Sequence, residues 1–146
     1  MKIGTYILIV RLGKKREIRV GKLGAFPFRM GYYFYIGSAF GPGGLNARIS
    51  RHYRQQKKRH WHIDYLTSED KIIDVWFSDQ EKKHECGWAN ILEGVSELQY
   101  PVPGFGATDC SCLSHLFYSR KKPLFEDYRK LLRSGLARWS PCSSKP

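Results

Sequence analysis

Short runs of apolar, β-branched and aromatic residues characterise the first part of the chain. Residues 5–10 are rich in such side chains, which is typical of a buried strand. Residues 17–20 alternate polar and apolar positions after a turn-like Gly-Lys-Lys stretch, so we expect a hairpin here, followed by a loop over residues 21–27. Residues 32–36 are aromatic and apolar, and they predict a third strand.

Helical spacing replaces this pattern after the glycine-rich turn at residues 41–44. From residue 45, apolar positions recur on one helical face, while Arg48 and His52 share a neighbouring face. Tyr35 comes from the strand that precedes this predicted helix. A tyrosine, an arginine and a histidine that converge in this way suit a phosphate-binding site.

The rest of the chain continues the alternation of strands and helices. Residues 61–66 fit either a strand or a helix, and residues 71–77 predict a strand. Residues 81–92 suit a helix that Gly94 ends, and two prolines and two glycines make residues 101–106 a loop. The last predicted elements are an edge strand over residues 113–118 and a helix with an apolar stripe at Phe125, Tyr128, Leu131 and Leu132.

Together these elements predict a single α/β domain over residues 1–139 and a flexible tail over residues 140–146. We expect a small mixed or antiparallel sheet of about three to four central strands, flanked by helices and extended by an extra N-terminal hairpin. A length of 146 residues with 42% hydrophobic content suffices for one compact core. No run approaches the roughly 18 apolar residues that span a bilayer, and the N-terminus does not resemble a signal peptide, so we expect a cytoplasmic protein without membrane contacts.

The charge balance points to a polyanionic partner. The chain has 25 Lys and Arg residues against 13 Asp and Glu residues, which gives a formal net charge of +12. Such an excess favours nucleic acid, although it does not separate an enzyme from a binding protein. Each basic cluster alone also fits a solvated face, but the clusters are interleaved with aromatic residues that could stack on bases. The candidate nucleic-acid-binding residues are Arg51, Arg54, Lys57, Lys58 and Arg59.

The four cysteines are irregularly spaced, which argues against a disulfide scaffold and for reduced thiols or a metal site. Cys110, Cys112 and His115 are close in sequence, and Cys86 could complete a Cys₃His tetrahedron suited to Zn²⁺. On a strand, Cys110 and Cys112 would face the same way and His115 the other way unless the chain bends. The alternative is that the thiols pack as small hydrophobic groups.

Several motifs in a fixed order resemble the GIY-YIG nucleases. Gly4-Thr5-Tyr6 stands where that family has its first triplet, with Thr for the usual Ile, and Tyr35-Ile36-Gly37 matches the second triplet. Arg48 and His52 fall where the family carries a helix-borne arginine and a second polar residue one turn later. The similarity is narrower to a little-characterised, domain-of-unknown-function branch of this family. Its motifs here are Gly-Ser-Ala-x-Gly-Pro-Gly-Gly-Leu at 37–45, His-Trp-His-Ile-Asp-Tyr-Leu at 60–66, Glu85-Cys86, Gly-Phe-Gly at 104–106 and Asp-Cys-x-Cys at 109–112.

The resemblance implies a site for phosphodiester hydrolysis, which needs positive charge and hydrogen-bond donors around one phosphate. Tyr6, Tyr35, Arg48 and His52 would form the phosphate site, and His62 is either a further site residue or a satisfied core histidine. Glu85 best matches the carboxylate that holds one Mg²⁺ or Mn²⁺ ion in that family. Without the triplets, the tyrosines would be read as strand aromatics and Arg48 as a solvated helix residue.

The function that these observations favour is a metal-dependent endonuclease that hydrolyses DNA in repair or processing, with DNA favoured over RNA. The first alternative is a catalytically weak or inactive nucleic-acid-binding module that keeps the fold and the basic surface. The second is a zinc-stabilised adaptor for another protein, and a protein partner for targeting would also suit a small nuclease without a separate recognition domain.

Overall fold

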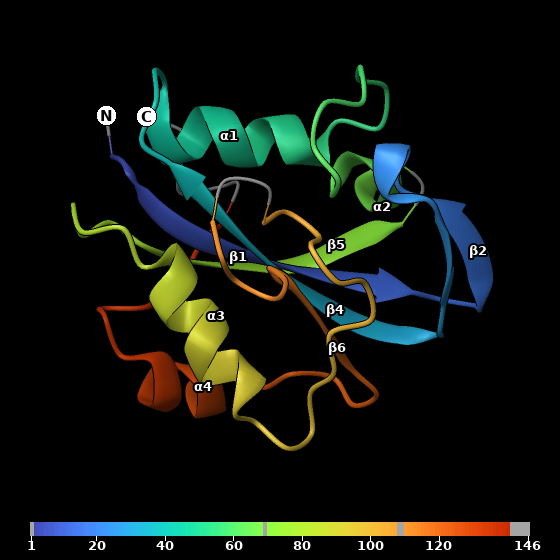
Figure 1. Cartoon of the computed structure of the whole chain (residues 1–146). Coiled ribbons are helices and arrows are strands. Elements are labelled where there is room, and N and C mark those ends of the chain that lie inside the picture. Colours follow the sequence, from blue (N-terminus) through green and yellow to red (C-terminus); the bar gives the residue numbers. More distant parts are fainter. Residues whose placement is uncertain (1, 69, 108–109, 141–146) are drawn as a thin grey trace.

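The computed structural model describes residues 2–68, 70–107 and 110–140 (Figure 1). These residues form an α/β fold around one five-stranded sheet in which every paired strand is antiparallel. The expected number of three to four central strands was therefore too low. The additional strand has only two residues, which is too short to leave a pattern in the sequence. The spatial order is β6 (Leu116–Ser119), β4 (Gly31–Ala39), β1 (Gly4–Leu12), β5 (Lys71–Ser78) and β7 (Ala137–Arg138).

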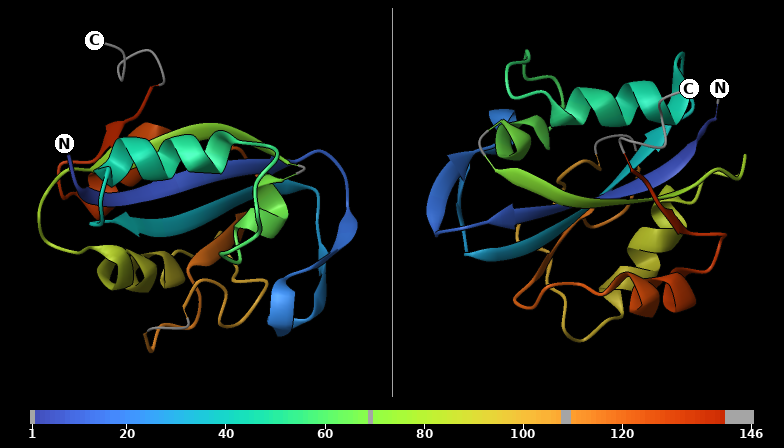
Figure 2. Two further views of the ribbon diagram at one scale, coloured as in Figure 1. Left: turned by 90° about the horizontal axis from the view of Figure 1, so that it is seen from above. Right: turned by 180° about the vertical axis from the view of Figure 1, so that it is seen from behind.

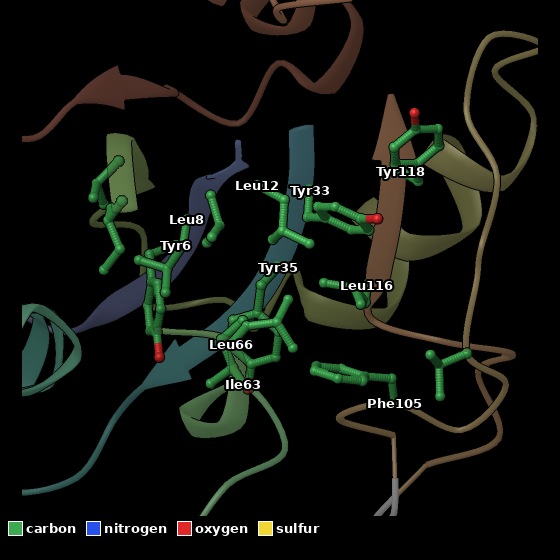
Figure 3. Packing of buried hydrophobic residues seen from close by; sticks show 14 of the residues in the cluster. Tyr6, Leu8, Leu12, Tyr33, Tyr35, Ile63, Leu66, Phe105, Leu116 and Tyr118 are labelled. Carbon is green, nitrogen blue, oxygen red and sulfur yellow. The ribbon is translucent and has the colours of Figure 1, made fainter. Parts of the chain in front are cut away.

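The central strands β1 and β4 are buried on both faces, which explains their nearly continuous apolar runs. Alternate residues of β1 enter different cores because strand side chains alternate in direction. Tyr6 and Leu8 pack in one core, whereas Ile7 and Ile9 pack in the other. Figure 3 shows the first core, in which Tyr6, Leu8 and other side chains from the sheet meet Ile63, Leu66 and Phe105.

Helices cover both faces of the sheet (Figures 1 and 2). On one face lie α1 (Gly44–Tyr53) and α2 (Asp64–Thr67), and on the other lie α3 (Glu85–Glu93) and α4 (Phe125–Leu132). The ambiguous residues 61–66 thus contribute to a short helix. Helix α3 begins four residues later than the predicted start because residues 81–83 are charged and exposed, so they contribute no buried apolar face to a helix.

The N-terminal hairpin is present, but its strands pair differently from the prediction. Strand β2 (Arg16–Arg19) pairs with β3 (Ala25–Phe28), and the short 3₁₀ helix η1 (Gly21–Leu23) connects them. The turn-like Gly-Lys-Lys stretch joins β1 to β2 without pairing them, because β4 and β5 occupy both edges of β1. The expected loop over residues 21–27 is wrong in part, since it includes most of β3.

The remaining elements follow the predicted order. Strand β6 lies at the edge of the sheet as expected, although it begins at Leu116 rather than at residue 113. Most of the predicted tail, residues 141–146, lies outside the described residues. None of the described helices is long and apolar enough to cross a membrane.

Gly4 allows β1 and β5 to approach closely. A Cβ atom at this position would collide with the backbone carbonyl oxygen of Ser78 on β5. The backbone of a central sheet cannot move away as a flexible side chain can, so this glycine is required by packing.

We predict that Gly4→Ala lowers the free energy of unfolding by about 2–3 kcal/mol, because the new methyl group must displace β5. Gly13→Ala is the matched control, since no atom lies within 4 Å of a Cβ built there, and it should change stability by less than about 0.5 kcal/mol. Urea unfolding monitored by fluorescence measures both values. Equal losses in the two variants would contradict this explanation.

Candidate functional site

A pocket of about 280 Å³ opens where β4, α1, the turn before α2 and the start of α3 meet. Four of the predicted site residues line it: Tyr35, Arg48, His62 and Glu85. These residues come from four separate parts of the chain, and the fold brings them together. The other lining residues are Ser38, His60, Trp61 and Gly106.

Arg48 is held by the sheet and by an aromatic ring. Its Nη1 donates a hydrogen bond of 2.9 Å to the backbone carbonyl oxygen of Ser38 on β4. Its guanidinium carbon lies 4.3 Å from the centroid of the Trp61 ring, a cation–π geometry. These contacts place a permanent positive charge in the wall of the pocket.

Tyr6 and His52 lie behind this wall rather than in it. Both are 1% exposed, and the Tyr6 hydroxyl lies 2.6 Å from His52 Nε2. The Tyr6 side chain reaches the helix by crossing Gly37, its partner in the β1–β4 pairing. A Cβ atom at Gly37 would lie only 2.5 Å from the Tyr6 hydroxyl oxygen. The glycine of the second triplet therefore makes room for the tyrosine of the first.

Burial keeps this group of rings uncharged. It raises the pKa of Tyr6 well above its ordinary value, with a further increase from the Tyr35 phenol, and Arg48 only partly opposes these effects. Burial and then the Glu85 carboxylate raise the pKa of Tyr35, again against Arg48. Burial lowers the pKa of His52 to about 3, although Asp64 opposes this. Both tyrosines are thus neutral phenols near pH 7, and His52 is a neutral imidazole whose Nε2 faces Tyr6 instead of the pocket.

His62 lines the pocket and is only partly buried, so it is not a core histidine. The backbone amide of Gly106 donates a 2.8 Å hydrogen bond to His62 Nδ1. An amide can only donate, so Nδ1 carries no proton and the neutral ring has its proton on Nε2. Burial lowers the pKa of His62, which favours this neutral form. The ring is positioned by the backbone and supplies a hydrogen-bond donor to the pocket lining.

Glu85 is the first residue of α3, where the helix dipole favours a carboxylate. The preceding residue is fixed by the first triplet, because the backbone amide of His84 donates a 3.2 Å hydrogen bond to the buried Thr5 hydroxyl. The Glu85 Oε2 atom lies 3.5 Å from His115 Nδ1. Glu85 therefore borders both the pocket and the cysteine-rich loop.

The predicted Cys₃His group is assembled in the structure. The ligand atoms of Cys86, Cys110, Cys112 and His115 all lie within 4.8 Å of one another, so this cluster could hold a metal ion. Cys110 and Cys112 lie in a loop and not on a strand, and the bend in this loop brings His115 to the same side as the thiols.

The basic residues in the last turn of α1 and after it differ in what they contact. Arg51 forms an ion pair with the fully buried Asp64 carboxylate through two hydrogen bonds of 2.9 and 3.0 Å. Lys57 Nζ donates to the backbone carbonyl oxygens of His52 and Arg54 and so caps the end of α1. Both cations therefore have structural partners. The exposed basic residues of this segment are Arg54, Lys58 and Arg59.

Asp64 organises the turn that carries His60, Trp61 and His62, although it was not among the predicted site residues. Besides Arg51, its carboxylate accepts hydrogen bonds from the backbone amides of His60 and Trp61, at 2.8 and 2.9 Å. A lone carboxylate within an otherwise apolar stretch, close to a basic segment, was the signal that could have identified it.

The family described as "Domain of unknown function DUF123" matches residues 5–136. The chain belongs to this family. The DUF123 match includes every residue of the pocket lining and of the Cys₃His cluster. No curated protein and no solved structure matched the chain.

The burial of His52 predicts how stability depends on pH. Its pKa is about 3 in the folded state and near 6.5 in the unfolded state, so the unfolded state binds more protons between these values. The free energy of unfolding should fall as the pH drops below about 6.5. Between pH 6.5 and 5 we expect the wild type to lose up to roughly 2 kcal/mol more than His52→Gln does.

Urea unfolding at a series of pH values measures this difference. The matched control is His60→Gln, which removes an exposed histidine and should follow the wild-type pH curve. If the wild type and His52→Gln lose stability in parallel, the folded imidazole is not kept neutral by burial.

Proposed function

We propose that the pocket binds a backbone phosphate of DNA and that the protein is a metal-dependent endonuclease that hydrolyses phosphodiester bonds in DNA repair or processing. The observation that carries the proposal is the chemistry of one small pocket. It gathers a guanidinium from Arg48, a phenol from Tyr35, an imidazole N–H from His62 and a carboxylate from Glu85. Phosphodiester hydrolysis develops negative charge on phosphate oxygens, and such charge is stabilised by prearranged donors.

Each side chain has a role that matches its protonation state. Arg48 supplies a fixed planar cation for the nonbridging phosphate oxygens. His62 donates through Nε2 and, because that nitrogen already carries a proton, it acts as a donor and not as a base. Tyr35 is a neutral phenol that orients the attacking water. Tyr6 and His52 support the pocket from behind, and Tyr6 fixes the position of α1.

The residues present fit a hard divalent cation, Mg²⁺ or Mn²⁺. Among the described lining residues one carboxylate is present, Glu85, and such ions bind through one or two carboxylates while they keep several waters. When bound, the ion supplies charge neutralisation at the phosphate and lowers the pKa of the attacking water. This contribution matters here because neither tyrosine is ionised near pH 7.

The surface next to the pocket supports a nucleic-acid substrate. Arg54, Lys58 and Arg59 are exposed on the segment that joins α1 to the pocket turn. Trp61 lies at the pocket itself, where its ring contacts the guanidinium groups of Arg48 and Arg51. A phosphate in the pocket would thus have both charged and aromatic groups beside it.

The second candidate function is a nucleic-acid-binding module without catalytic activity. The neutral tyrosines and the buried, neutral His52 favour it, since none of them is a ready proton acceptor in the resting protein. The basic surface alone would serve this function, and metal-dependent cleavage separates the two candidates.

We predict that the wild type nicks supercoiled plasmid in Mg²⁺ or Mn²⁺ and is inactive in chelator. Arg48→Ala and Glu85→Ala should each reduce the rate by at least about 10²-fold, because each removes a group that stabilises the transition state. The gel-based nicking rate at saturating metal measures this. The same assay on structured DNA and on RNA tests the substrate class.

Matched controls are Glu93→Ala, an exposed carboxylate at the far end of α3, and Arg129→Ala, an exposed arginine on α4. Both should keep wild-type rates. No cleavage by the wild type with any metal, together with salt-dependent DNA binding, would favour the binding module. Cleavage that survives both pocket variants would refute the site.

The exposed basic segment predicts the salt dependence of binding. Replacement of Arg54, Lys58 and Arg59 by alanine should reduce the slope of log K against log salt by up to about 2.7, because each neutralised phosphate accounts for roughly 0.9 of that slope. Fluorescence anisotropy with labelled duplex DNA at several salt concentrations measures the slope. Lys130→Ala on α4 is the control and should leave the slope unchanged.

A further inference from the structure

We propose that Cys86, Cys110, Cys112 and His115 bind one structural Zn²⁺ ion, and that the zinc-bound His115 positions the Glu85 carboxylate of the pocket. The inference does not rest on nuclease activity. It concerns a second site, whose four ligands are not among the lining residues of the pocket, and it assigns to that site a metal and a role in positioning Glu85.

The distances suit tetrahedral zinc. With Zn–S near 2.3 Å and Zn–N near 2.0–2.1 Å, tetrahedral ligands lie about 3.5–3.8 Å apart. Cys110 Sγ lies 3.5 Å from His115 Nε2, and no pair of ligand atoms in the cluster exceeds 4.8 Å. Small rotations of the cysteine and histidine side chains would bring the four ligand atoms to the spacing of a tetrahedral zinc site. Three thiolates and one imidazole form a ligand set that structural zinc sites use, whereas Mg²⁺ prefers oxygen.

The orientation of His115 provides a second, independent observation. The side chain is 2% exposed, and its Nδ1 atom has no hydrogen-bond partner among the described residues. An unsatisfied buried nitrogen is costly. Coordination through Nε2 puts the ring proton on Nδ1, and the nearest charged acceptor is Glu85 Oε2 at 3.5 Å. Metal-bound histidines usually donate their other N–H to such a carboxylate, which fixes the ring.

The local architecture explains what zinc would stabilise. The loop over residues 101–115 has no helix or strand of its own in its described part, yet it forms one side of the pocket through Gly106. Three of the four ligands lie in or at the end of this loop, and the fourth, Cys86, lies on α3 beside Glu85. One ion would therefore attach the loop to the helix that carries the pocket carboxylate.

Metal analysis of untagged protein, purified without chelator, tests the site directly. We expect about one zinc per chain. The thiols of Cys86, Cys110 and Cys112 should become reactive only after zinc is removed. Co²⁺ in place of zinc should give the strong visible bands of a tetrahedral site and thiolate-to-cobalt charge transfer in the near ultraviolet. A zinc content near zero without cobalt uptake, or a disulfide among these cysteines, would overturn the proposal.

Variants distinguish the ligands from their neighbours. Cys112→Ser should lose zinc, and the conservative Cys112→His should keep a tetrahedral Co²⁺ spectrum with weaker charge transfer. The spectrum of Cys112→His keeps the test valid if the serine variant does not fold. His84→Gln is the control: this residue precedes Glu85 but stacks on Trp88 and contacts Gln80, so the variant should keep its zinc.

The proposed contact between His115 and Glu85 is tested separately, by measuring zinc affinity. Glu85→Gln should keep zinc but bind it about 10-fold more weakly, because the partner that orients His115 loses its charge. Competition with a chromogenic chelator measures this affinity in the absence of nucleic acid. Wild-type affinity in Glu85→Gln would refute the link. Loss of DNA cleavage in Arg48→Ala, with zinc affinity unchanged, would concern the proposed function alone.

Discussion

The close pairing of Tyr6 with Gly37 is the constraint on which the site depends. Because Gly37 has no side chain, the Tyr6 ring crosses β4 and its hydroxyl meets His52 on α1. This contact fixes the helix over the sheet, and Arg48 on the same helix binds the carbonyl oxygen of Ser38, the residue after Gly37. A slip of one residue in the register would place a side chain where the ring lies and would reverse the faces of β4. The wall of the pocket therefore follows from the register of two central strands.

The contacts of Arg48 and Arg51 distinguish a cation that could bind an anion from one with a structural role. Arg48 and Arg51 both lie over the Trp61 ring, with guanidinium carbons 4.3 and 4.2 Å from its centroid. Arg51 is neutralised by the buried Asp64, which also holds the turn that carries Trp61. Arg48 is held instead by a neutral carbonyl and an aromatic ring, so its charge is available to an anion. Breaking the buried pair by removing Asp64 would leave Arg51 uncompensated, which is costly.

The sequence predicted the elements whose hydrophobic pattern permits only one arrangement. Strands β1, β4 and β5 and helix α1 fall in this class, and the spacing of Arg48 and His52 correctly placed them on one helix. Helical spacing predicts which side of a helix a residue lies on, but it does not predict how deeply the side chain is buried. The burial of His52 behind Tyr6 could therefore not be predicted. Strand β7 was too short to detect, and β2 pairs with β3 rather than with β1 because β4 and β5 occupy both edges of β1. The Cys₃His cluster also depends on a loop bend that spacing alone does not determine.

Thr5 fixes the first turn of α3, which contributes one residue to the pocket and one to the Cys₃His cluster. Its buried hydroxyl accepts the backbone amide of His84 and so fixes the first turn of α3 against the central strand. Successive side chains on a helix point roughly 100° apart, so Glu85 and Cys86 face different directions from the same rigid turn. Glu85 borders the pocket and Cys86 belongs to the metal cluster. An ion bound to the cluster would therefore be attached to the turn that holds the pocket carboxylate, and the Thr5 hydroxyl anchors that same turn to the sheet.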